Sequence, residues 1–396
     1  MWIGLKGPNK PTGMKRMALY VGTLPASQEA WRLRDWCMYS LLKPLVASRP
    51  EDLFVLLFSG PAPAGLFAAD PNVHCRSLGP VPRRLLSLYR QLNYKWPAVL
   101  QQSGSQLLVS LTGVLPLRKG RPACLLLSDG VLSPQAAVPK EGPDRYRRRF
   151  LPRFLKQANQ LVTLSDFGRQ RLMSEYQIPE HRITVVTRGP VSGFEALGWE
   201  ERQAVKEQYT GGKEYLLYPG DIRRENNIVG LLKAFSVLKK KMRSGMALVL
   251  AGALDSGFKK FPELLGTYHF RKDVICTGAL PIEERARLMG GAYGCILTDG
   301  PLDFTSWVPE ALKCRTPLVL PEASVHASIA GPAACCFHPG DVEDMGEQLC
   351  RLYRDEELRA RLIAAADERL QHFSWSQAAH SLATALFAAA EKTTTK

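Results

Sequence analysis

Short apolar runs alternate with longer amphipathic stretches along almost the whole chain. Strands that alternate with helices in this way predict a parallel sheet covered on both faces, as in a Rossmann-like domain. In the first half, the predicted strands are residues 17–21, 53–58, 107–110, 123–127, 160–164 and 183–186. The predicted helices between them are residues 28–46, 82–100, 145–158 and 166–176.

The same pattern restarts after a loop at Gly189 and Pro190, so a second α/β domain is predicted. Open parallel sheets bind ligands at the carboxyl ends of their strands, and we therefore expect the functional site in a cleft between the two domains. The predicted strands are residues 215–218, 247–251, 274–276, 294–297 and 317–320. The predicted helices are residues 199–209, 226–243, 258–268, 282–290 and 306–313, with a helical tail over 342–390. The predicted domains are residues 1–190 and 191–375, with a C-terminal helix at 376–396 that packs back on the first domain.

The composition is typical of a folded, soluble protein. The chain has 396 residues, of which 45% are hydrophobic and 22% are charged, and this excludes a disordered chain. Its apolar runs are shorter than the roughly 18 residues of a membrane span. The first residues resemble no signal peptide, so we expect a cytoplasmic protein. The nine cysteines are odd in number and form no C-x-x-C pair, which favours reduced core residues over disulfides or metal ligands.

A series of short motifs follows this pattern, mainly in the second half. They include LYPGDIRRENNI at 217–228, LVLAG at 248–252, TGALP at 277–281, PEAL at 309–312, TPLVL at 316–320, AGPAA at 330–334 and FSW at 373–375. In order and spacing the series resembles the retaining family-four nucleotide-sugar glycosyltransferases, and ANQLVTLSDFG at 158–168 resembles their first domain. The resemblance implies the α/β GT-B fold, in which two Rossmann-like domains face each other across a cleft. It also implies transfer of a sugar from a nucleotide-diphosphate donor to a glycan or lipid-linked acceptor, without a metal or other cofactor.

The chain departs from the family in the loop that binds the donor diphosphate. Fixed cations and backbone N–H groups stabilise the negative charge that develops on a departing diphosphate. The family has an Arg directly after the glycine that is Gly220 here, and a Lys five residues later, whereas this chain has Asp221 and Asn226. Arg223 and Arg224 are either shifted diphosphate ligands or solvated loop charges.

A second departure lies in the segment whose two glutamates hold the donor sugar and the ribose in the family. Leu302 occupies the first glutamate position, and Asp303 is the candidate substitute for the lost carboxylate. Glu310 is retained, and it either accepts hydrogen bonds from the ribose or is a first-turn glutamate favoured by the helix dipole. Thr305 and Ser306 either cap the helix or present N–H groups to a phosphate. The predicted donor-binding residues are Gly220, Arg223, Arg224, Gly278, Leu280, Thr305, Ser306 and Glu310.

A third departure concerns the acceptor side, where the family often has a His-Asp pair. Here the pair is Ser128 and Asp129, and Asp129 either holds an acceptor hydroxyl or forms a turn before Gly130. Asp129 and Asp303 are thus the candidate catalytic residues. The chain has no D-x-D motif, and its seven histidines form no ligand motif, so no metal site is predicted.

Positive charge is concentrated in one predicted helix. Lys and Arg number 52 against 37 Asp and Glu, a formal charge of +15, and residues 145–156 form an amphipathic basic helix. Such a helix suits anionic lipid head groups and a peripheral position on the inner face of the membrane, with a solvated helix face as the alternative. The charge is accompanied by no nucleic-acid recognition motif, so no nucleic-acid partner is expected. The predicted membrane contacts are Arg147, Arg148, Arg149 and Arg153.

Two hypotheses of different kinds follow. Either the protein is a retaining, metal-independent glycosyltransferase in the synthesis of envelope polysaccharides or glycoconjugates, or it is a non-catalytic GT-B protein that acts as a scaffold, partner subunit or glycan binder. The residues at Asp221, Asn226, Leu302 and Ser128 favour the second hypothesis. Retention of Glu310 and of the surrounding motifs favours the first, which we prefer.

Overall fold

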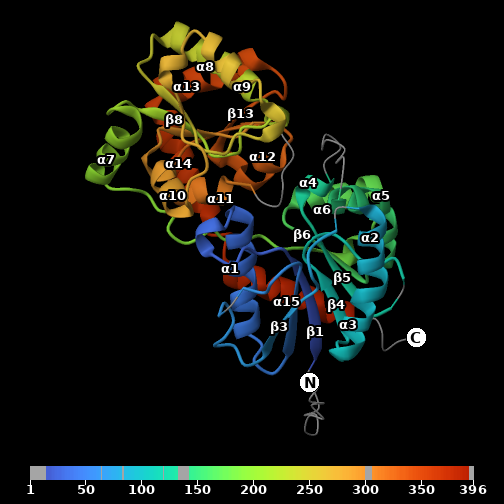
Figure 1. Ribbon diagram of the computed structural model, residues 1–396. Helices are drawn as coiled ribbons and strands as arrows, with labels where there is room; N and C mark the ends of the chain where they lie inside the picture. The colour runs from blue at the N-terminus through green and yellow to red at the C-terminus, as the bar shows by residue number, and fades with distance from the viewer. Residues whose placement is uncertain are drawn as a thin grey trace.

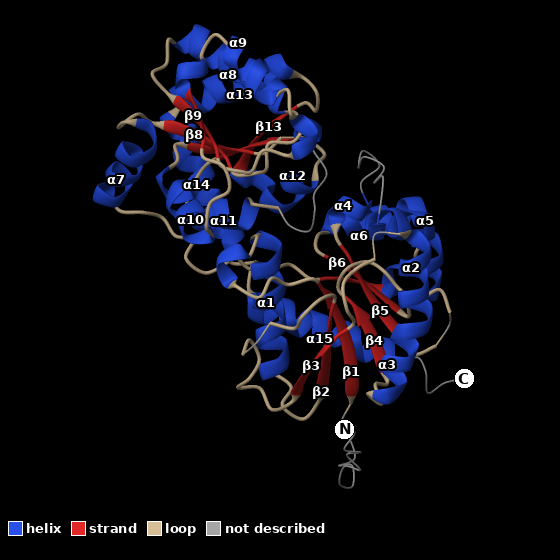
Figure 2. Cartoon of the chain, viewed as in Figure 1, coloured by secondary structure: helices blue, strands red, loops and turns tan. Residues whose placement is uncertain are grey.

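Two parallel β-sheets organise the chain, one in each half of the sequence (Figures 1 and 2). The computed structural model describes residues 15–63, 65–82, 84–118, 120–132, 142–298 and 306–391. The first sheet has the strand order β3-β2-β1-β4-β5-β6-β7. Its strands are β1 (Arg16–Gly22), β2 (Leu53–Phe58), β3 (Val73–Ser77), β4 (Leu107–Ser110), β5 (Ala123–Leu127), β6 (Gln160–Thr163) and β7 (Ile183–Val185).

The second sheet has the order β10-β9-β8-β11-β12-β13. In each sheet the strand order reverses beside the first strand, at β1 and β4 in one and at β8 and β11 in the other. Ligands of open parallel sheets bind beyond the carboxyl ends of the strands at such a reversal. The strands are β8 (Tyr215–Tyr218), β9 (Ala247–Leu250), β10 (Val274–Cys276), β11 (Gly294–Ile296), β12 (Leu318–Pro321) and β13 (Ala334–Phe337).

Helices cover both faces of each sheet, and for this reason the central strands are buried along nearly their whole length and are mostly apolar. The first half contributes α1 (Leu33–Ala47), α2 (Leu85–Arg90), α3 (Trp96–Gln102), α4 (Asp129–Leu132), α5 (Gly142–Gln157) and α6 (Asp166–Tyr176). The second half contributes α7 (Trp199–Thr210), α8 (Ile228–Met242), α9 (Phe261–Thr267), α10 (Ile282–Gly291), α11 (Val308–Lys313), α12 (Val325–Ala330), α13 (Val342–Arg354), α14 (Glu356–Leu370) and α15 (Trp375–Glu391). Among the described residues, no helix is both long and apolar enough to cross a bilayer.

Four of these elements were not predicted, namely β3, β13, α4 and α12. β3 is an edge strand whose side chains are mostly exposed, so its sequence Val-His-Cys-Arg-Ser has no buried run. β13 is a four-residue edge strand, whereas α4 and α12 have only four and six residues. The remaining predicted elements lie within a few residues of their predicted bounds.

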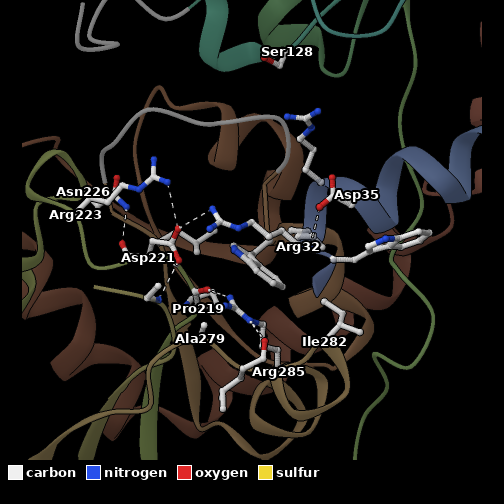
Figure 3. A pocket seen from close by; sticks show the side chains of 18 of the residues that line it. Arg32, Asp35, Ser128, Pro219, Asp221, Arg223, Asn226, Ala279, Ile282 and Arg285 are labelled. Atoms are coloured by element: carbon white, nitrogen blue, oxygen red, sulfur yellow. Dashed lines mark hydrogen bonds and ion pairs between the residues drawn. The ribbon is translucent and has the colours of Figure 1, made fainter. Parts of the chain in front are cut away.

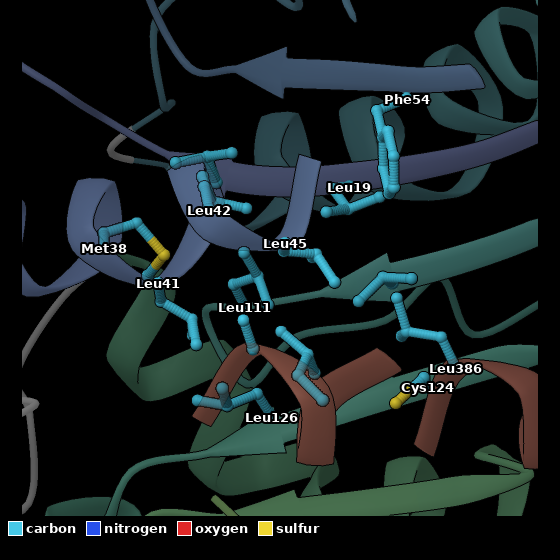
Figure 4. Packing of buried hydrophobic residues seen from close by; sticks show 14 of the residues in the cluster. Leu19, Met38, Leu41, Leu42, Leu45, Phe54, Leu111, Cys124, Leu126 and Leu386 are labelled. Atoms are coloured by element: carbon cyan, nitrogen blue, oxygen red, sulfur yellow. The ribbon is translucent and has the colours of Figure 1, made fainter. Parts of the chain in front are cut away.

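The last helix, α15, belongs to the core of the first sheet. Ala378, Leu382 and Leu386 are buried together with Leu42 of α1 and Leu126 of β5. Figure 4 shows α1 and α15 lying over the strands of this sheet, with Leu386 beside Cys124. One face of the first sheet is therefore covered by helices from opposite ends of the sequence.

The junction between the two halves is closely packed. The Trp375 indole N–H donates to the carbonyl oxygen of Pro190, at 2.7 Å. A Cβ atom on Gly189 would lie only 2.9 Å from the Trp375 ring, so only glycine fits there without displacing the indole. Leu33 and Cys37 of α1 are buried in the core of the second sheet, which ties the first helix to the second domain.

Candidate functional site

A cleft of about 810 Å³ lies between the two domains, at the carboxyl ends of their central strands. Thr112 and Ser128 follow β4 and β5 of the first sheet, and Pro219 and Thr298 follow β8 and β11 of the second. The cleft therefore has walls from both domains at the two points where the strand order reverses. This is the place where the sequence pattern predicts a ligand.

Arginine is the prominent residue type in the cleft. The acidic residues of the lining are Glu29, Asp35, Asp144 and Asp221. They are fewer than the arginines, so the described lining carries a small excess of positive charge. Cations fixed in a cleft between protein walls of low dielectric attract anions more strongly than they would in open solution. The arginines that line the cleft are Arg32, Arg34, Arg147, Arg223 and Arg285.

Asp221 lies at the centre of these charges (Figure 3). Its Oδ1 accepts the backbone N–H of Ala253 at 3.1 Å, which joins the loop after β8 to the loop after β9. Its Oδ2 lies 3.3 Å from Arg223 Nη2 and 3.8 Å from Arg32 Nη1. The negative charge at the family's arginine position is therefore matched by arginines from both domains.

Asn226 has a supporting role in the same loop. Its Nδ2 donates to Tyr218 Oη and to the carbonyl oxygen of Asp221, both at 2.9 Å. The loop is closely packed around its glycines, because a Cβ on Gly220 would lie 2.6 Å from Tyr218 Oη and one on Gly252 would lie 2.1 Å from the Gly220 carbonyl oxygen. The residue at the family's lysine position thus holds the shape of the loop.

Arg285 of α10 is the best-anchored cation of the cleft. Its Nε donates to the carbonyl oxygen of Leu280 at 3.1 Å, and its Nη1 donates to that of Pro219 at 2.9 Å. Its guanidinium also lies over the Trp307 ring, 5.5 Å from the ring centre. Burial lowers the pKa of Arg285 from its ordinary value, and the charge of Asp221 opposes this shift. Both Arg285 and Arg32 were missed in the sequence, since neither belongs to a family motif.

The arrangement of the two domains and the sequence of the second agree with known proteins. A glycosyltransferase from Rickettsia africae ESF-5 superposes with a TM-score of 0.70 at 13% identity, over 95% of this chain and 99% of that one. Anabaena Alr3699/HepE in complex with UDP and glucose gives 0.69 at 16% identity, over 94% and 99%. Residues 200–369 match the family described as "Glycosyl transferases group 1". The second domain is therefore similar to glycosyl transferases group 1, and residues 200–369 are called the group 1 domain below. The fold of the chain is GT-B, as the motifs imply.

A curated relative matches the chain over a longer span. The O-antigen chain mannosyltransferase B of Escherichia coli is 24% identical over 232 residues. The match spans 58% of this chain and 61% of that relative's length.

Glu310 lies on α11 of the group 1 domain but does not line the cleft. It is fully buried, and its two carboxylate oxygens accept hydrogen bonds from Arg188 Nη1 and Nη2, both at 2.7 Å. Oε1 also accepts the backbone N–H of Val191 at 3.0 Å. Arg188 precedes the junction between the domains and donates in addition to the carbonyl oxygens of Gly189 and Ser306. In this arrangement the carboxylate joins the domains, and its predicted contact with a ribose stays a prediction.

Ser306 and His326 form a buried pair at the edge of the cleft. Ser306 Oγ lies 2.7 Å from His326 Nδ1 and accepts the backbone N–H of Val308 at 3.2 Å, so it serves the start of α11. Burial lowers the pKa of His326 to about 4, and its imidazole is neutral at neutral pH. His326 lines the cleft, although no sequence motif around it predicted a role in the site.

Ser128 lines the cleft (Figure 3), whereas its neighbour Asp129 does not. The Asp129 carboxylate is buried, and its Oδ1 accepts the Ser165 hydroxyl at 2.7 Å. A Cβ on Gly168 would lie 2.5 Å from this oxygen, so α6 packs directly on the carboxylate. Burial raises the pKa of Asp129 to about 6, against the hydrogen bond from Ser165, which lowers it.

The other predicted residues divide into three groups. Gly220, Arg223 and Leu280 line the cleft, whereas Gly278 and Arg224 do not. The family's first glutamate position and its neighbours, Leu302, Asp303 and Thr305, lie outside the described residues. In the described part of the chain, no group of three or more His, Cys, Asp or Glu side chains could hold a metal ion.

The basic helix α5 differs from the expectation in two respects. Arg147 lines the cleft, where it donates to the Thr112 carbonyl oxygen at 3.1 Å and to Asp144 at 2.7 Å. The apolar stripe of the helix, which includes Tyr146 and Phe154, is buried in the core of the first domain. The exposed face of α5 therefore carries cations, among them Arg148, Arg149 and Arg153, without an apolar stripe of its own.

Proposed function

We propose that the protein is a glycosyltransferase that moves a sugar from a nucleotide-diphosphate donor to a glycan or lipid-linked acceptor. The observation that carries this proposal is the arginine-lined cleft between the group 1 domain and the first domain. The cleft lies at the strand-order reversals of both sheets, where a donor and an acceptor can be brought together from opposite walls.

The arginines of the cleft suit the charge that the reaction creates. When the bond between the sugar and the diphosphate breaks, negative charge grows on the departing phosphate oxygens. Arg285, held by two carbonyl oxygens, and Arg223 on the loop after β8 stabilise that charge from fixed positions. We propose that these cations take the place of a metal ion and that transfer proceeds with retention, with the leaving diphosphate assisting deprotonation of the acceptor.

The relatives indicate which substrates to test first. The E. coli relative is an O-antigen chain mannosyltransferase, and the Anabaena structure holds UDP and glucose. We therefore propose a hexose donor, with mannose and glucose as the first candidates, and an acceptor from the synthesis of an envelope polysaccharide.

A lipid-linked acceptor requires contact with a membrane surface, and one face of the first domain suits it. Leu86 and Tyr94 are 65% and 53% exposed, and the Arg118 guanidinium lies 4.5 Å from the centre of the Tyr94 ring. Asn93, next to Tyr94, donates to Tyr146 of α5 at 3.3 Å, and this buried contact packs the segment that carries Tyr94 against the basic helix. We propose that this face binds anionic lipid, with Leu86 and Tyr94 providing the apolar contact that α5 lacks. Cosedimentation with anionic vesicles should fall in a variant in which Arg148, Arg149 and Arg153 are replaced by Gln, and undiminished binding would contradict this assignment.

A non-catalytic GT-B protein is the second candidate, and Glu310 is the observation that favours it. Both of its oxygens are engaged by Arg188, so this carboxylate is not available to a ribose in the present arrangement. A scaffold or glycan-binding protein needs a stable junction between the domains but no donor site.

Two measurements separate the candidates. Calorimetry with UDP, GDP, UDP-glucose and GDP-mannose tests for the donor site, and absence of binding at millimolar ligand would contradict the transferase proposal. Release of UDP or GDP in the presence of an extract of lipid-linked glycans tests for turnover. Arg285→Gln should abolish turnover, whereas Arg287→Gln on the same helix, outside the cleft lining, should retain it. Nucleotide binding without any sugar transfer would favour the non-catalytic candidate.

A further inference from the structure

Asp221 lies between two arginines that come from different domains (Figure 3). Arg223 belongs to the same loop after β8, whereas Arg32 stands at the start of α1 in the first domain. The ion pair between Arg32 and Asp221 joins residues that are far apart in the sequence, and it spans the cleft. Arg32 is therefore a cleft arginine whose ion-pair partner is on the opposite wall.

The backbone of Arg32 is fixed while its guanidinium is not. Asp35 Oδ2 accepts the backbone N–H of Arg32 at 3.0 Å, and the neighbouring Trp31 is buried with its indole N–H donated to the Pro25 carbonyl oxygen at 2.9 Å. The Arg32 side chain itself is 73% exposed. Because these hydrogen bonds hold the backbone and not the tip of the Arg32 side chain, the guanidinium can change partners without moving α1.

The contact between Arg32 and Asp221 is weak enough to be exchanged. At 3.8 Å the two atoms form an ion pair beyond hydrogen-bond distance, and exposed pairs of this kind contribute little to stability. A diphosphate offers more negative charge than one carboxylate and several oxygens, which suit the two-pronged geometry of a guanidinium. Arg285 lines the same cleft as Asp221 and Arg32, and the charges of both influence its pKa.

We propose that Arg32 supplies, from the first domain, the cation that the donor loop lacks, and that Asp221 holds it until the donor diphosphate replaces the carboxylate. The proposal rests on the proposed function, because it assigns a ligand to the same cleft. It also accounts for the acidic residue at the family's arginine position, since Asp221 positions Arg32 and Arg223 in the absence of the donor. Closure of the cleft and donor binding are then linked through one arginine.

The first test compares nucleoside diphosphates with monophosphates by calorimetry. Arg32→Gln should weaken binding of UDP or GDP about tenfold while changing binding of UMP or GMP much less, since the monophosphate lacks the second charged group. Arg76→Gln, on the edge strand β3 and outside the cleft lining, is the matched control and should bind like the wild type.

The second test removes the competing carboxylate. Asp221→Asn keeps an oxygen that can accept the Ala253 N–H but releases both arginines, so diphosphate binding should become severalfold tighter. This gain should shrink when Arg32→Gln is added. If the wild type binds a diphosphate and Arg32→Gln binds it equally well, or if Asp221→Asn binds it more weakly, this inference is wrong while the proposed function stands. If the wild type binds neither UDP nor GDP, the proposed function fails, and the inference fails with it.

Discussion

Two arginine–carboxylate pairs connect the halves of this molecule, and they differ in almost everything except their chemistry. Arg188 and Glu310 are buried, with two hydrogen bonds of 2.7 Å, in the junction between the domains. Arg32 and Asp221 lie in the open cleft, 3.8 Å apart, with 73% of the arginine side chain exposed. A buried pair cannot lose one member without leaving an uncompensated charge, whereas an exposed pair can be replaced by water or by another ion. Burial therefore decides which of the two pairs stabilises the structure and which can exchange its partner for a ligand.

The largest effect is expected from breaking the buried pair. Glu310→Ala leaves the Arg188 guanidinium buried without its carboxylate, and the free energy of unfolding should fall by about 3–5 kcal/mol in urea titrations. Glu322→Ala, which removes a half-exposed glutamate of the same domain, should change it by less than about 0.5 kcal/mol. Replacing both Arg188 and Glu310 by Leu should restore much of the loss. A Glu310→Ala protein with wild-type stability would show that the pair does not hold the junction.

Asp129 is also a buried carboxylate, but its hydrogen-bond donor is the Ser165 hydroxyl instead of a guanidinium. Burial raises its pKa to about 6, so the folded state binds this proton more tightly than the unfolded chain does. The resulting stabilisation is complete below about pH 4 and is lost as the pH rises through 6, by at most about 3 kcal/mol. The Asp129→Asn variant should lack this pH-dependent part of the free energy of unfolding. The difference in unfolding free energy between the two proteins, measured from pH 4 to pH 7.5, should therefore change with pH, and a constant difference would contradict the raised pKa.

A smaller change in free energy, measured as nucleotide binding and separate from the loss of turnover, is expected from Arg285, which two carbonyl oxygens hold in the cleft. Arg285→Gln should weaken binding of UDP or GDP about tenfold, since it removes a fixed charge beside the loop after β8. Arg287→Gln on the same helix is the control, because Arg287 pairs with Glu284 outside the cleft lining. Calorimetry measures both, and equal losses in the two variants would point to a general effect of charge.

The smallest effect is expected on stability when the exposed pair is broken. Arg32→Gln and Asp221→Asn should each change the free energy of unfolding by less than about 1 kcal/mol. Urea titrations at low and high salt provide the measurement. A loss of 2 kcal/mol or more, as expected for a buried pair, would mean that this contact also holds the domains together.

Much of the fold could be predicted from the sequence, because central strands of a parallel sheet are continuous apolar runs. β8, β10 and α6 have the bounds predicted from such runs and from helical spacing. The edge strand β3 could not be found in this way, since four of its five residues are exposed and Val-His-Cys-Arg-Ser contains no apolar run. β10 is also an edge strand but was found from the run Val-Ile-Cys, whereas the apolar strand β13, Ala-Cys-Cys-Phe, was overlooked. The polar sequence of β3, and not its edge position, therefore explains why that strand was missed.

The site was less predictable than the fold. The motif around Gly220 correctly located one wall of the cleft, and Arg223 lines it. Arg285 could have been suspected, because it lies one turn into the helix that begins directly after the TGALP motif. Arg32 and the burial of Glu310 could not, since each depends on a contact between distant parts of the chain that no local spacing encodes.

The return of α15 to the first sheet has a consequence for biosynthesis. During translation, β1 to β7 leave the ribosome long before the helix that covers one of their faces, and the whole second sheet is made in the interval. Until α15 emerges, the positions that will contact Ala378, Leu382 and Leu386 remain uncovered by it, a condition in which nascent chains tend to aggregate. A fragment that ends near residue 190 should therefore be poorly soluble when expressed alone, and a separately supplied α15 peptide should improve its recovery. The first domain, although made first, is completed last.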